Sequence, residues 1–362
     1  MKNLKVTILM SVYNGEKYLR KAVDSILNQT FKDFEFLIIN DGSTDKTAEI
    51  LQSYRDPRIK IVNNQKNMGL TKSLSRGLGI AKGDYIARMD ADDISMPERL
   101  EKQVNMLEQR PELGMVGTWY CVIDEKDNIK YEVKNDGNPV ILRWKLLFNN
   151  EFVHSSVMMR KRAYEDSGGY NPEFQAAQDY DLWSRIAKKW QIGLVPKILC
   201  YRRERTEHSI TIEKNKTQKA MARKVRVRSI DELTKLTNGR LPRKQCIDLY
   251  DLFNGYYVLD KVSQVEEILQ SLKMVRECFE DIFSDKSIRC EINDQLIAAL
   301  YGCISRASTF YQRVFLGIYV LWFGGWKSAH RMFLAFSGLF LPDSVRNGGK
   351  SFLKLLGWKK IR

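Results

Sequence analysis

A regular alternation of strand and helix patterns, running from the start of the chain to Gln109, most constrains what this sequence can fold into. Short apolar runs of the kind found in strands buried on both faces are each followed by a segment with apolar residues at helical spacing. These runs are Lys5–Val12, Phe34–Asn40, Ile59–Val62 and Asp84–Met89. Such repeats need right-handed crossovers and therefore predict an α/β fold with a mostly parallel central sheet flanked by helices.

The pattern becomes less regular from Gly114 onward. Further strands are predicted at Met115–Ile123, Ser155–Arg160 and Ile192–Arg203, and further helices at Val140–Phe148 and Asp179–Lys188. After residue 212 the sequence predicts helices only. Because 362 residues are enough for two domains, we predict an α/β domain over residues 1–212 and an all-helical region over residues 213–362.

The positive charge of the chain is concentrated in its second half. The formal net charge is +15; residues 1–200 carry 30 basic and 27 acidic side chains, and residues 201–362 carry 29 and 17. This excess predicts a polyanionic partner, for which nucleic acid and an anionic membrane surface are both candidates. The basic run Lys214–Arg228 is most simply a solvated helix face.

The last segment, residues 306–362, combines ten basic residues and one acid with Trp, Phe and Leu. It fits a helix in the interface of an anionic membrane, or a helical subdomain that buries its aromatic residues. The longest uncharged apolar stretch, Val314–Trp326, has 13 residues, whereas a membrane-spanning helix needs about 20. Six dispersed cysteines without a C-x-x-C pair indicate reduced thiols. We therefore expect a cytoplasmic protein, with peripheral attachment to the inner face of the cell membrane as a hypothesis.

Polar residues gather at the carboxyl ends of the predicted strands, where ligands bind in parallel sheets. Asn14, Asp41 and Asp90 each lie there. Asp90, Asp92 and Asp93 repel one another unless a cation or donor groups compensate, so they fit a divalent cation whose shell is completed by phosphate oxygens. A solvated loop with a helix-capping aspartate is the competing interpretation. Asp41 alone is typical of an ordinary turn.

One further carboxylate and three histidines are candidates for chemistry. Asp179 begins a predicted helix, where a carboxylate is stabilised, and it is either a general base or a cap. His154, His208 and His330 are each isolated in the sequence. Because a lone histidine is usually structural, the residues alone favour no ligand role for any of them.

Taken together, these segments resemble a family 2 glycosyltransferase of the GT-A fold over about residues 4–212. The matching motifs are VTILMSVYN (6–14), DGSTD (41–45), NMGL (67–70), GDYIARMDADD (83–93), PERLEKQ (97–103), HSSVMMR (154–160), GGY (168–170), QDYDLW (178–183) and YR (201–202). Each motif is weak alone, but their order and spacing together are specific. The resemblance implies a nucleotide-diphosphate-sugar donor, with UDP the commonest nucleotide among similar enzymes.

The resemblance also implies where the donor binds. The loop after the first strand, with Tyr13 and Asn14, would hold the nucleoside together with Asp41. Asp90 would lie against the ribose or base, and Arg88 of the same motif would face the donor. This assignment gives the polar residues at the strand ends a common role in binding the donor.

For the chemical step, the resemblance implies a Mn²⁺ or Mg²⁺ ion on the diphosphate, with Asp92 and His208 as ligands. Asp179 would be the general base that deprotonates an acceptor hydroxyl, so that a single displacement inverts the anomeric configuration. The sequence departs from the usual family pattern at Gln178, where Glu is common, and at Ser75, where Asn is common. His208 also follows Tyr201 at an unusually long spacing.

The acceptor suggested by the basic, aromatic tail and by similar enzymes is a saccharide or lipid-linked oligosaccharide in surface polysaccharide biosynthesis. A transferase that acts on a polyprenyl phosphate, with the same donor site, is the alternative within the fold class. A nucleic-acid-binding protein is disfavoured, because no RNA-binding or helix-turn-helix motif is present and acidic loops repel phosphates; we expect no nucleic-acid partner. A sugar-nucleotide-binding protein without turnover is disfavoured by the full set of aspartates.

Overall fold

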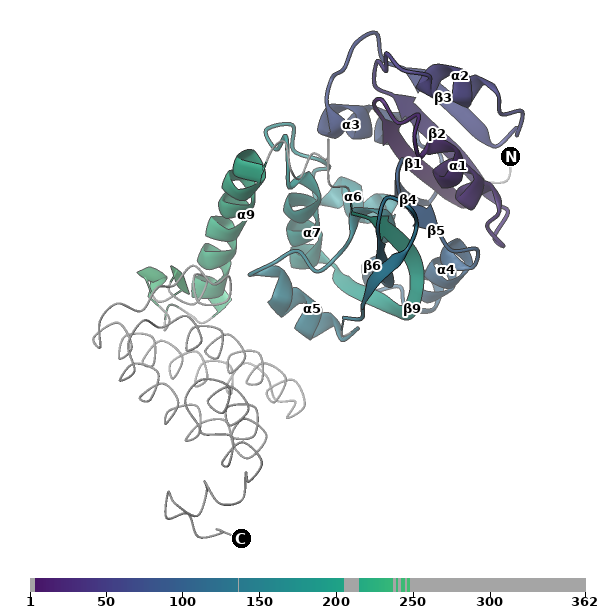
Figure 1. Cartoon of the computed structure of the whole chain (residues 1–362). Coiled ribbons are helices and arrows are strands. Elements are labelled where there is room, and N and C mark those ends of the chain that lie inside the picture. Colours follow the sequence, from purple (N-terminus) through teal and green to yellow (C-terminus); the bar gives the residue numbers. More distant parts are fainter. Residues whose placement is uncertain are drawn as a thin grey trace, which may run out of the picture. The chain divides into compact units, whose positions relative to one another are not determined.

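The computed structural model describes residues 4–135, 137–204 and 215–236, together with 239, 242–244 and 246–247 (Figure 1). The chain divides into two compact units, Met1–Ser229 and Ile230–Arg362, and the first carries the motifs analysed above. The predicted boundary at residue 212, His208, His330 and the basic aromatic tail all lie outside the described residues. In the described part, no helix is long and apolar enough to cross a membrane.

A mixed sheet of nine strands forms the centre of the first unit. Its order is β3-β2-β1-β4-β8-β6-β9-β5, with β7 paired to β6. The strands are β1 (Val6–Val12), β2 (Phe34–Asn40), β3 (Ile59–Asn63), β4 (Tyr85–Asp90), β5 (Ile94–Ser95), β6 (Leu113–Ile123), β7 (Ile129–Val133), β8 (Met158–Arg160) and β9 (Gln191–Arg203). Strands β3, β2, β1 and β4 are parallel, whereas β8 is antiparallel to both β4 and β6.

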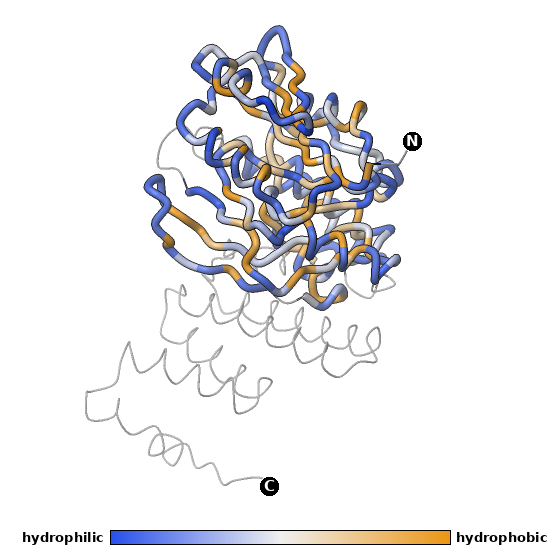
Figure 2. Tube along the Cα trace, turned by 90° about the vertical axis from the view of Figure 1, so that its right-hand side faces the viewer, coloured by the Kyte–Doolittle hydropathy of each residue, from blue (hydrophilic) through white to orange (hydrophobic). Residues whose placement is uncertain are grey.

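Helices cover both faces of this sheet and explain why its central strands are apolar on both sides. Along β1, Ile8 packs in the core beneath α1, α2 and α4, whereas Leu9 packs in the core beneath α3, α5, α6, α7 and α9. The helices are α1 (Leu19–Leu27), α2 (Thr47–Gln52), α3 (Leu70–Ile80), α4 (Arg99–Gln109), α5 (Pro139–Leu146), α6 (Lys161–Asp166), α7 (Gln178–Lys189) and α9 (Asn215–Leu236). Figure 2 shows apolar stretches alternating with polar ones along the chain of this unit.

The predicted α/β architecture is confirmed, with two kinds of departure. The elements β5, β7 and α6 were not predicted from the sequence, because they are short or, in β7, largely exposed. Strand β8 is also shorter than predicted, because residues His154–Ser156 form a 3-10 turn, η1, before the strand begins at Met158. This turn brings His154 to the carboxyl end of β4, where the candidate site lies.

Part of the basic run Lys214–Arg228, which was predicted to be a solvated helix face, packs against α7 within the first unit. Asp181, which is fully buried in α7, forms ion pairs with Arg185, at 2.6 Å, and with Arg228 of α9. The Arg228 guanidinium also lies over the ring of Phe174. Arg185 in turn donates to the carbonyl of Gly169 at 2.6 Å. These contacts hold the part of α9 that belongs to the first unit against α7 and the loop that follows the Gly168-Gly169-Tyr170 motif.

Replacing Arg228 by Met should destabilise the first unit, because Asp181 would keep only one of its two cationic partners inside the core. A lost hydrogen bond to a charged group costs about 1.5–3 kcal/mol, and the retained Arg185 should keep the loss near the lower end. Urea denaturation of the full chain measures it. Arg223→Met on the exposed face of the same helix is the matched control and should change stability by less than about 0.5 kcal/mol. Equal stability of the two variants would contradict the role given to Arg228.

Candidate active site

The loop after β1 is pinned to the loop after β2 at one end of the sheet. Asn14 has a left-handed backbone, with φ of 50°, and its N–H donates to Ser43 Oγ at 3.1 Å. Its Oδ1 accepts from the backbone N–H of Thr44 at 2.9 Å. Tyr13, next to it, remains 48% exposed. The two predicted nucleoside residues therefore lie at the carboxyl ends of the parallel strands, with the tyrosine ring accessible.

Asp41 organises the loops of this same edge from within. It is only 2% exposed, and Oδ1 accepts from Asn64 Nδ2 at 2.6 Å and from the Met68 N–H at 2.9 Å. Its Oδ2 accepts from the N–H of Gly69 at 2.9 Å. Because Gly69 has φ of 89°, which a residue with a Cβ rarely adopts, the turn into α3 depends on this glycine. Asp41 thus holds the chain before α3 against β2.

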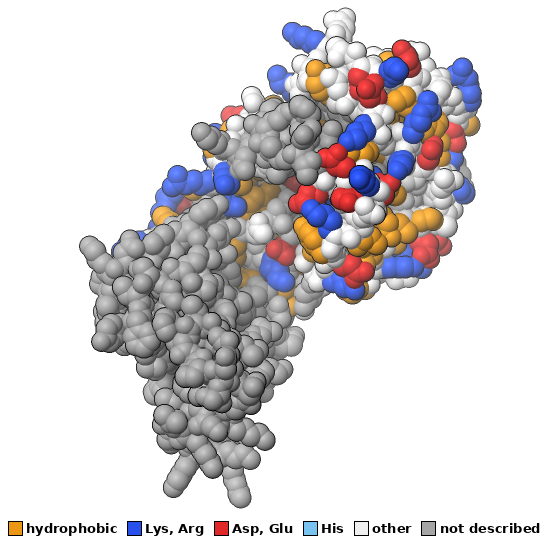
Figure 3. Space-filling view, viewed as in Figure 1, with side chains coloured by type: hydrophobic (Ala, Val, Ile, Leu, Met, Phe, Trp, Pro, Cys, Tyr) orange, Lys and Arg blue, Asp and Glu red, His pale blue; other side chains and the backbone are white. Residues whose placement is uncertain are grey.

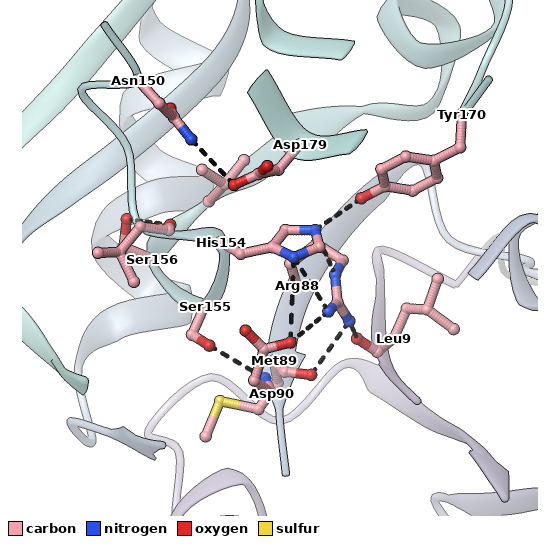
Figure 4. A network of polar contacts seen from close by, with 12 residues as sticks. Leu9, Arg88, Met89, Asp90, Asn150, His154, Ser155, Ser156, Tyr170 and Asp179 are labelled. Atoms are coloured by element: carbon pink, nitrogen blue, oxygen red, sulfur yellow. Dashed lines mark hydrogen bonds and ion pairs between the residues drawn. The ribbon is translucent and has the colours of Figure 1, made fainter. Parts of the chain in front are cut away.

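Asp90 ends β4 beside a fully buried arginine (Figure 4). Arg88 Nη2 donates to Asp90 Oδ1 at 2.6 Å, and Nη1 donates to the carbonyls of Met89, at 3.0 Å, and Leu9. The Asp90 side chain itself is 30% exposed. Burial works to raise the pKa of Asp90, but the positive charge of Arg88 and the contacts with Ser155 and Arg88 outweigh it and hold the pKa below its usual value. Arg88 therefore lies behind Asp90 and keeps it ionised.

The next two carboxylates of this loop are tied to the end of β9. Asp93 is buried, and its Oδ1 accepts from the backbone N–H of Arg203 at 2.8 Å. Burial, and then the negative charges of Asp92 and Asp90, raise the pKa of Asp93 well above its usual value. Arg203 Nε donates to the backbone carbonyl of Asp92 at 2.9 Å. Arg203 therefore fixes the backbone of the loop in which Asp92 stands.

Asp92 is the one predicted metal ligand that the structure describes. Within the described ranges, no three His, Cys, Asp or Glu side chains come together in a way that would hold a metal ion. Mg²⁺ typically binds through one or two carboxylates, with substrate phosphates completing its shell, so it needs no such cluster. The partly buried Asp92 supplies a hard oxygen ligand of the right kind, and the residues present fit an ion that arrives with a diphosphate.

Asp179 lies in the first turn of α7, as the sequence predicted. The helix begins after Ala177, which has φ of 54°, and Asp179 Oδ2 accepts from Asn150 Nδ2 at 2.9 Å. Burial is the main cause that raises the pKa of Asp179, and the charge of Asp90 adds to it. Figure 4 shows the His154 ring between the Asp179 and Asp90 carboxylates. A carboxylate with a raised affinity for a proton and one that stays ionised thus lie on either side of the His154 ring.

Several residues that shape the site received no role from the sequence. Arg99, fully buried in α4, donates to the carbonyl of Arg88 at 2.7 Å, and Gln103 donates to the carbonyl of Ser156 at 2.8 Å. The sequence held a sign of these contacts, because Arg99 and Gln103 are two polar residues four positions apart on the buried face of an amphipathic helix. Asn150 lies in an irregular segment, and no pattern in the sequence pointed to its contact with Asp179.

The fold and the acidic loop define a glycosyltransferase-type α/β unit, and comparison with known proteins agrees. The family described as "Glycosyl transferase family 2" matches residues 7–168. An uncharacterized glycosyltransferase of Haemophilus influenzae is 30% identical over 299 residues, which is 76% of this chain and 92% of the relative. The chain therefore belongs to glycosyltransferase family 2 and is a glycosyltransferase.

Two further similarities bear on fold and biology. The O-antigen biosynthesis glycosyltransferase WbnJ of Escherichia coli is 38% identical over 184 residues, covering 50% of this chain and 71% of WbnJ. The crystal structure of S. aureus TarS 1–349 superposes with a TM-score of 0.53 at 16% identity, covering 83% of this chain and 88% of that TarS 1–349 chain. The second similarity confirms the predicted GT-A fold.

Asp179→Asn should raise the melting temperature at pH 7.5. A carboxyl whose pKa is raised by folding stabilises the protein only while it is protonated. This contribution is lost as the pH rises from the unfolded value, about 3.9, through the folded pKa. A neutral amide removes the cost of a charge at this partly buried position and can still accept from Asn150. Thermal melts at pH 7.5 and near pH 4 test this: the difference between variant and wild type should shrink at the lower pH. A variant that is less stable at pH 7.5 would contradict this effect of burial.

Proposed function

We propose that this glycosyltransferase is an inverting enzyme that moves a sugar from a nucleotide-diphosphate donor, most simply a UDP-sugar, to an acceptor hydroxyl. The observation that carries the proposal is that two carboxyl groups of the site lie in environments that shift their pKa values in opposite directions. Asp90 is held ionised at the end of β4 by Arg88, and Asp179 has a raised proton affinity at the start of α7. Groups whose environments push their pKa values apart are typical of sites that bind with one carboxylate and transfer a proton with the other.

The donor is proposed to bind at the carboxyl ends of β1, β2 and β4. Tyr13, Asn14 and Asp41 would hold the nucleoside, and Asp90, supported from behind by Arg88, would contact the ribose or base. TarS 1–349 has also been solved in complex with UDP-GlcNAc, and that structure superposes with a TM-score of 0.51 at 16% identity, covering 84% of this chain and 81% of that TarS 1–349 chain. This neighbour supports UDP as the first nucleotide to try.

Mn²⁺ or Mg²⁺ is proposed to bind with the donor through Asp92, with His208 as a second ligand. When bound, the ion neutralises the negative charge that develops on the departing nucleoside diphosphate. The chain's own part is to hold the Asp92 backbone in place, which Arg203 does through its Nε contact.

Asp179 is proposed to take the proton from the acceptor hydroxyl as its oxygen attacks the anomeric carbon. Asn150 holds Oδ2, so it orients the carboxylate. Attack from the face opposite to the leaving diphosphate inverts the configuration and gives a β-linked product from an α-linked donor. The acceptor is proposed to be a saccharide or lipid-linked oligosaccharide, supported by the similarity to WbnJ. A cytoplasmic location with peripheral attachment to an anionic membrane through the basic tail completes the proposal.

Asp179→Asn should lower kcat for sugar transfer by about 10²–10⁴-fold, the usual contribution of a general base. It should leave the affinity for the donor nearly unchanged, because the residue contacts the acceptor. Initial rates with the donor and isothermal titration with UDP separate the two quantities. Full transfer to a hydroxyl acceptor by the variant would contradict the role of Asp179, and activity retained only toward a polyprenyl phosphate would favour the alternative acceptor.

Asp92→Asn should abolish the metal-dependent part of UDP binding, because an amide is a much weaker ligand for a hard divalent cation than a carboxylate. UDP titrations with Mn²⁺ and with EDTA measure that part directly. Asp84→Asn, at the exposed amino end of the same β4 region, is the matched control and should bind UDP like the wild type. Undiminished Mn²⁺ dependence in Asp92→Asn would refute the ligand role.

A further inference from the structure

The Arg88 guanidinium is fully buried, and each of its three nitrogen atoms has a hydrogen-bond partner. Nη1 donates to the carbonyls of Leu9 and Met89, both on central strands, and Nη2 donates to Asp90 Oδ1. Nε donates to His154 Nε2 at 2.9 Å, and Nη2 also lies 3.5 Å from His154 Nδ1. A guanidinium is planar, so fixing Nη1 and Nε fixes the direction of Nη2. The position of Asp90 therefore depends on His154 as well as on the strands.

His154 acts here as an acceptor. Its side chain is buried, and burial first and the charge of Arg88 second lower the pKa of His154 to about 3. The imidazole is therefore neutral throughout the physiological range, and Nε2 can accept from the Arg88 Nε–H. A protonated ring would instead place two N–H groups against the guanidinium. The pH switching for which histidine is often used is thus suppressed at this position.

The same ring nitrogen also reaches the other side of the site. The hydroxyl of Tyr170 lies 2.8 Å from His154 Nε2, and on the neutral ring its O–H shares the single lone pair of that nitrogen with the Arg88 Nε–H. Tyr170 is itself buried (Figure 4). Tyr170 opens the segment that leads to Ala177 and the first turn of α7, which carries Asp179. Arg185 holds the preceding Gly169 carbonyl from α7. Through Tyr170, His154 thus contacts the segment that places the proposed base.

We propose that His154 is a positioning residue that couples the two halves of the active site, by fixing the Arg88–Asp90 pair on the donor side and the Tyr170 segment on the acceptor side. This inference rests on the proposed donor role of Asp90. His154 touches neither substrate; it acts through Arg88 and Tyr170. Its replacement should therefore change donor affinity as a loss of Asp90 does, and the two losses should not add.

The experiment is a double-mutant cycle on UDP binding, measured by isothermal titration with Mn²⁺ on the full chain. His154→Phe should weaken UDP binding about ten-fold, within the range of couplings seen between linked sites. His154→Gln, whose amide oxygen can still accept from Arg88 Nε, should recover most of the affinity. Asp90→Asn should weaken binding to a similar degree. In the combined variant His154→Phe/Asp90→Asn the loss should stay close to that of one change alone, because coupled residues are not additive.

Removing the hydroxyl of Tyr170 tests the contact on the acceptor side and leaves the packing of the ring in place. Tyr170→Phe should lower kcat more than it changes UDP affinity. Tyr54→Phe is the matched control, since it also removes a tyrosine hydrogen bond, one to the carboxylate of Asp24 at 2.8 Å, and should change neither. His154→Gln and Tyr170→Phe keep the test decisive if His154→Phe does not fold.

The outcomes separate the inference from the function on which it rests. Wild-type affinity in His154→Phe, or losses that simply add in the combined variant, would overturn the coupling role while leaving the donor site intact. Failure of the wild-type chain to bind any of UDP, GDP, CDP and dTDP would overturn the proposed donor chemistry, and the inference with it.

Discussion

The contact between the buried Arg88 guanidinium and Asp90 is the interaction on which the site depends. A charge enclosed in the core is costly unless it is paired and hydrogen-bonded. Here the backbone carbonyls of Leu9 and Met89, the His154 ring and the Asp90 carboxylate satisfy it. These partners come from separate parts of the chain, so the charge holds β1, β4 and the η1 turn in register. Only the outer part of Asp90 remains exposed for a ligand.

The carboxyl groups near this pair differ in how their surroundings shift their pKa values. Asp90 stays ionised because a cation lies behind it, whereas burial raises the pKa of both Asp93 and Asp179. Asp93 accepts a hydrogen bond from the backbone N–H of Arg203, and this contact holds the acidic loop to β9. The surface of the first unit mixes basic and acidic side chains on the face seen in Figure 3, in keeping with the near balance of residues 1–200. The acidic character of the site is thus local.

Much of this arrangement was predictable from the sequence, because it depends on local patterns. The apolar runs predicted β1, β2, β3 and β4 almost to the residue. The rule that ligands bind at the carboxyl ends of parallel strands was enough to group Asn14, Asp41 and Asp90 from their places in the chain. The place of Asp179 at the start of a predicted helix was enough to make it a candidate for a general base or a helix cap. These inferences rest on the spacing of apolar residues and on the common direction of parallel strands, and both can be derived from a single sequence.

What could not be predicted depends on contacts between distant segments. The insertion of β8 between β4 and β6 brings His154 to Arg88, 66 residues away, and no local pattern encodes that pairing. Arg88 was expected to face the donor, but the fold encloses it, because the η1 turn and β1 cover it. Asn150 and the Arg228–Asp181 pair are likewise products of packing. Side-chain pairing across elements, more than secondary structure, limited what the sequence could predict about the site.

The proposed mechanism requires that a single base, Asp179, assist direct displacement at the anomeric carbon of a nucleotide sugar. The measurement that decides this is the anomeric configuration of the product formed from an α-linked UDP-sugar, determined from its ¹H NMR coupling constant. We predict a β-linked product, because the acceptor attacks from the face opposite to the diphosphate. An α-linked product would contradict the mechanism, since retention requires a second displacement or attack from the same face.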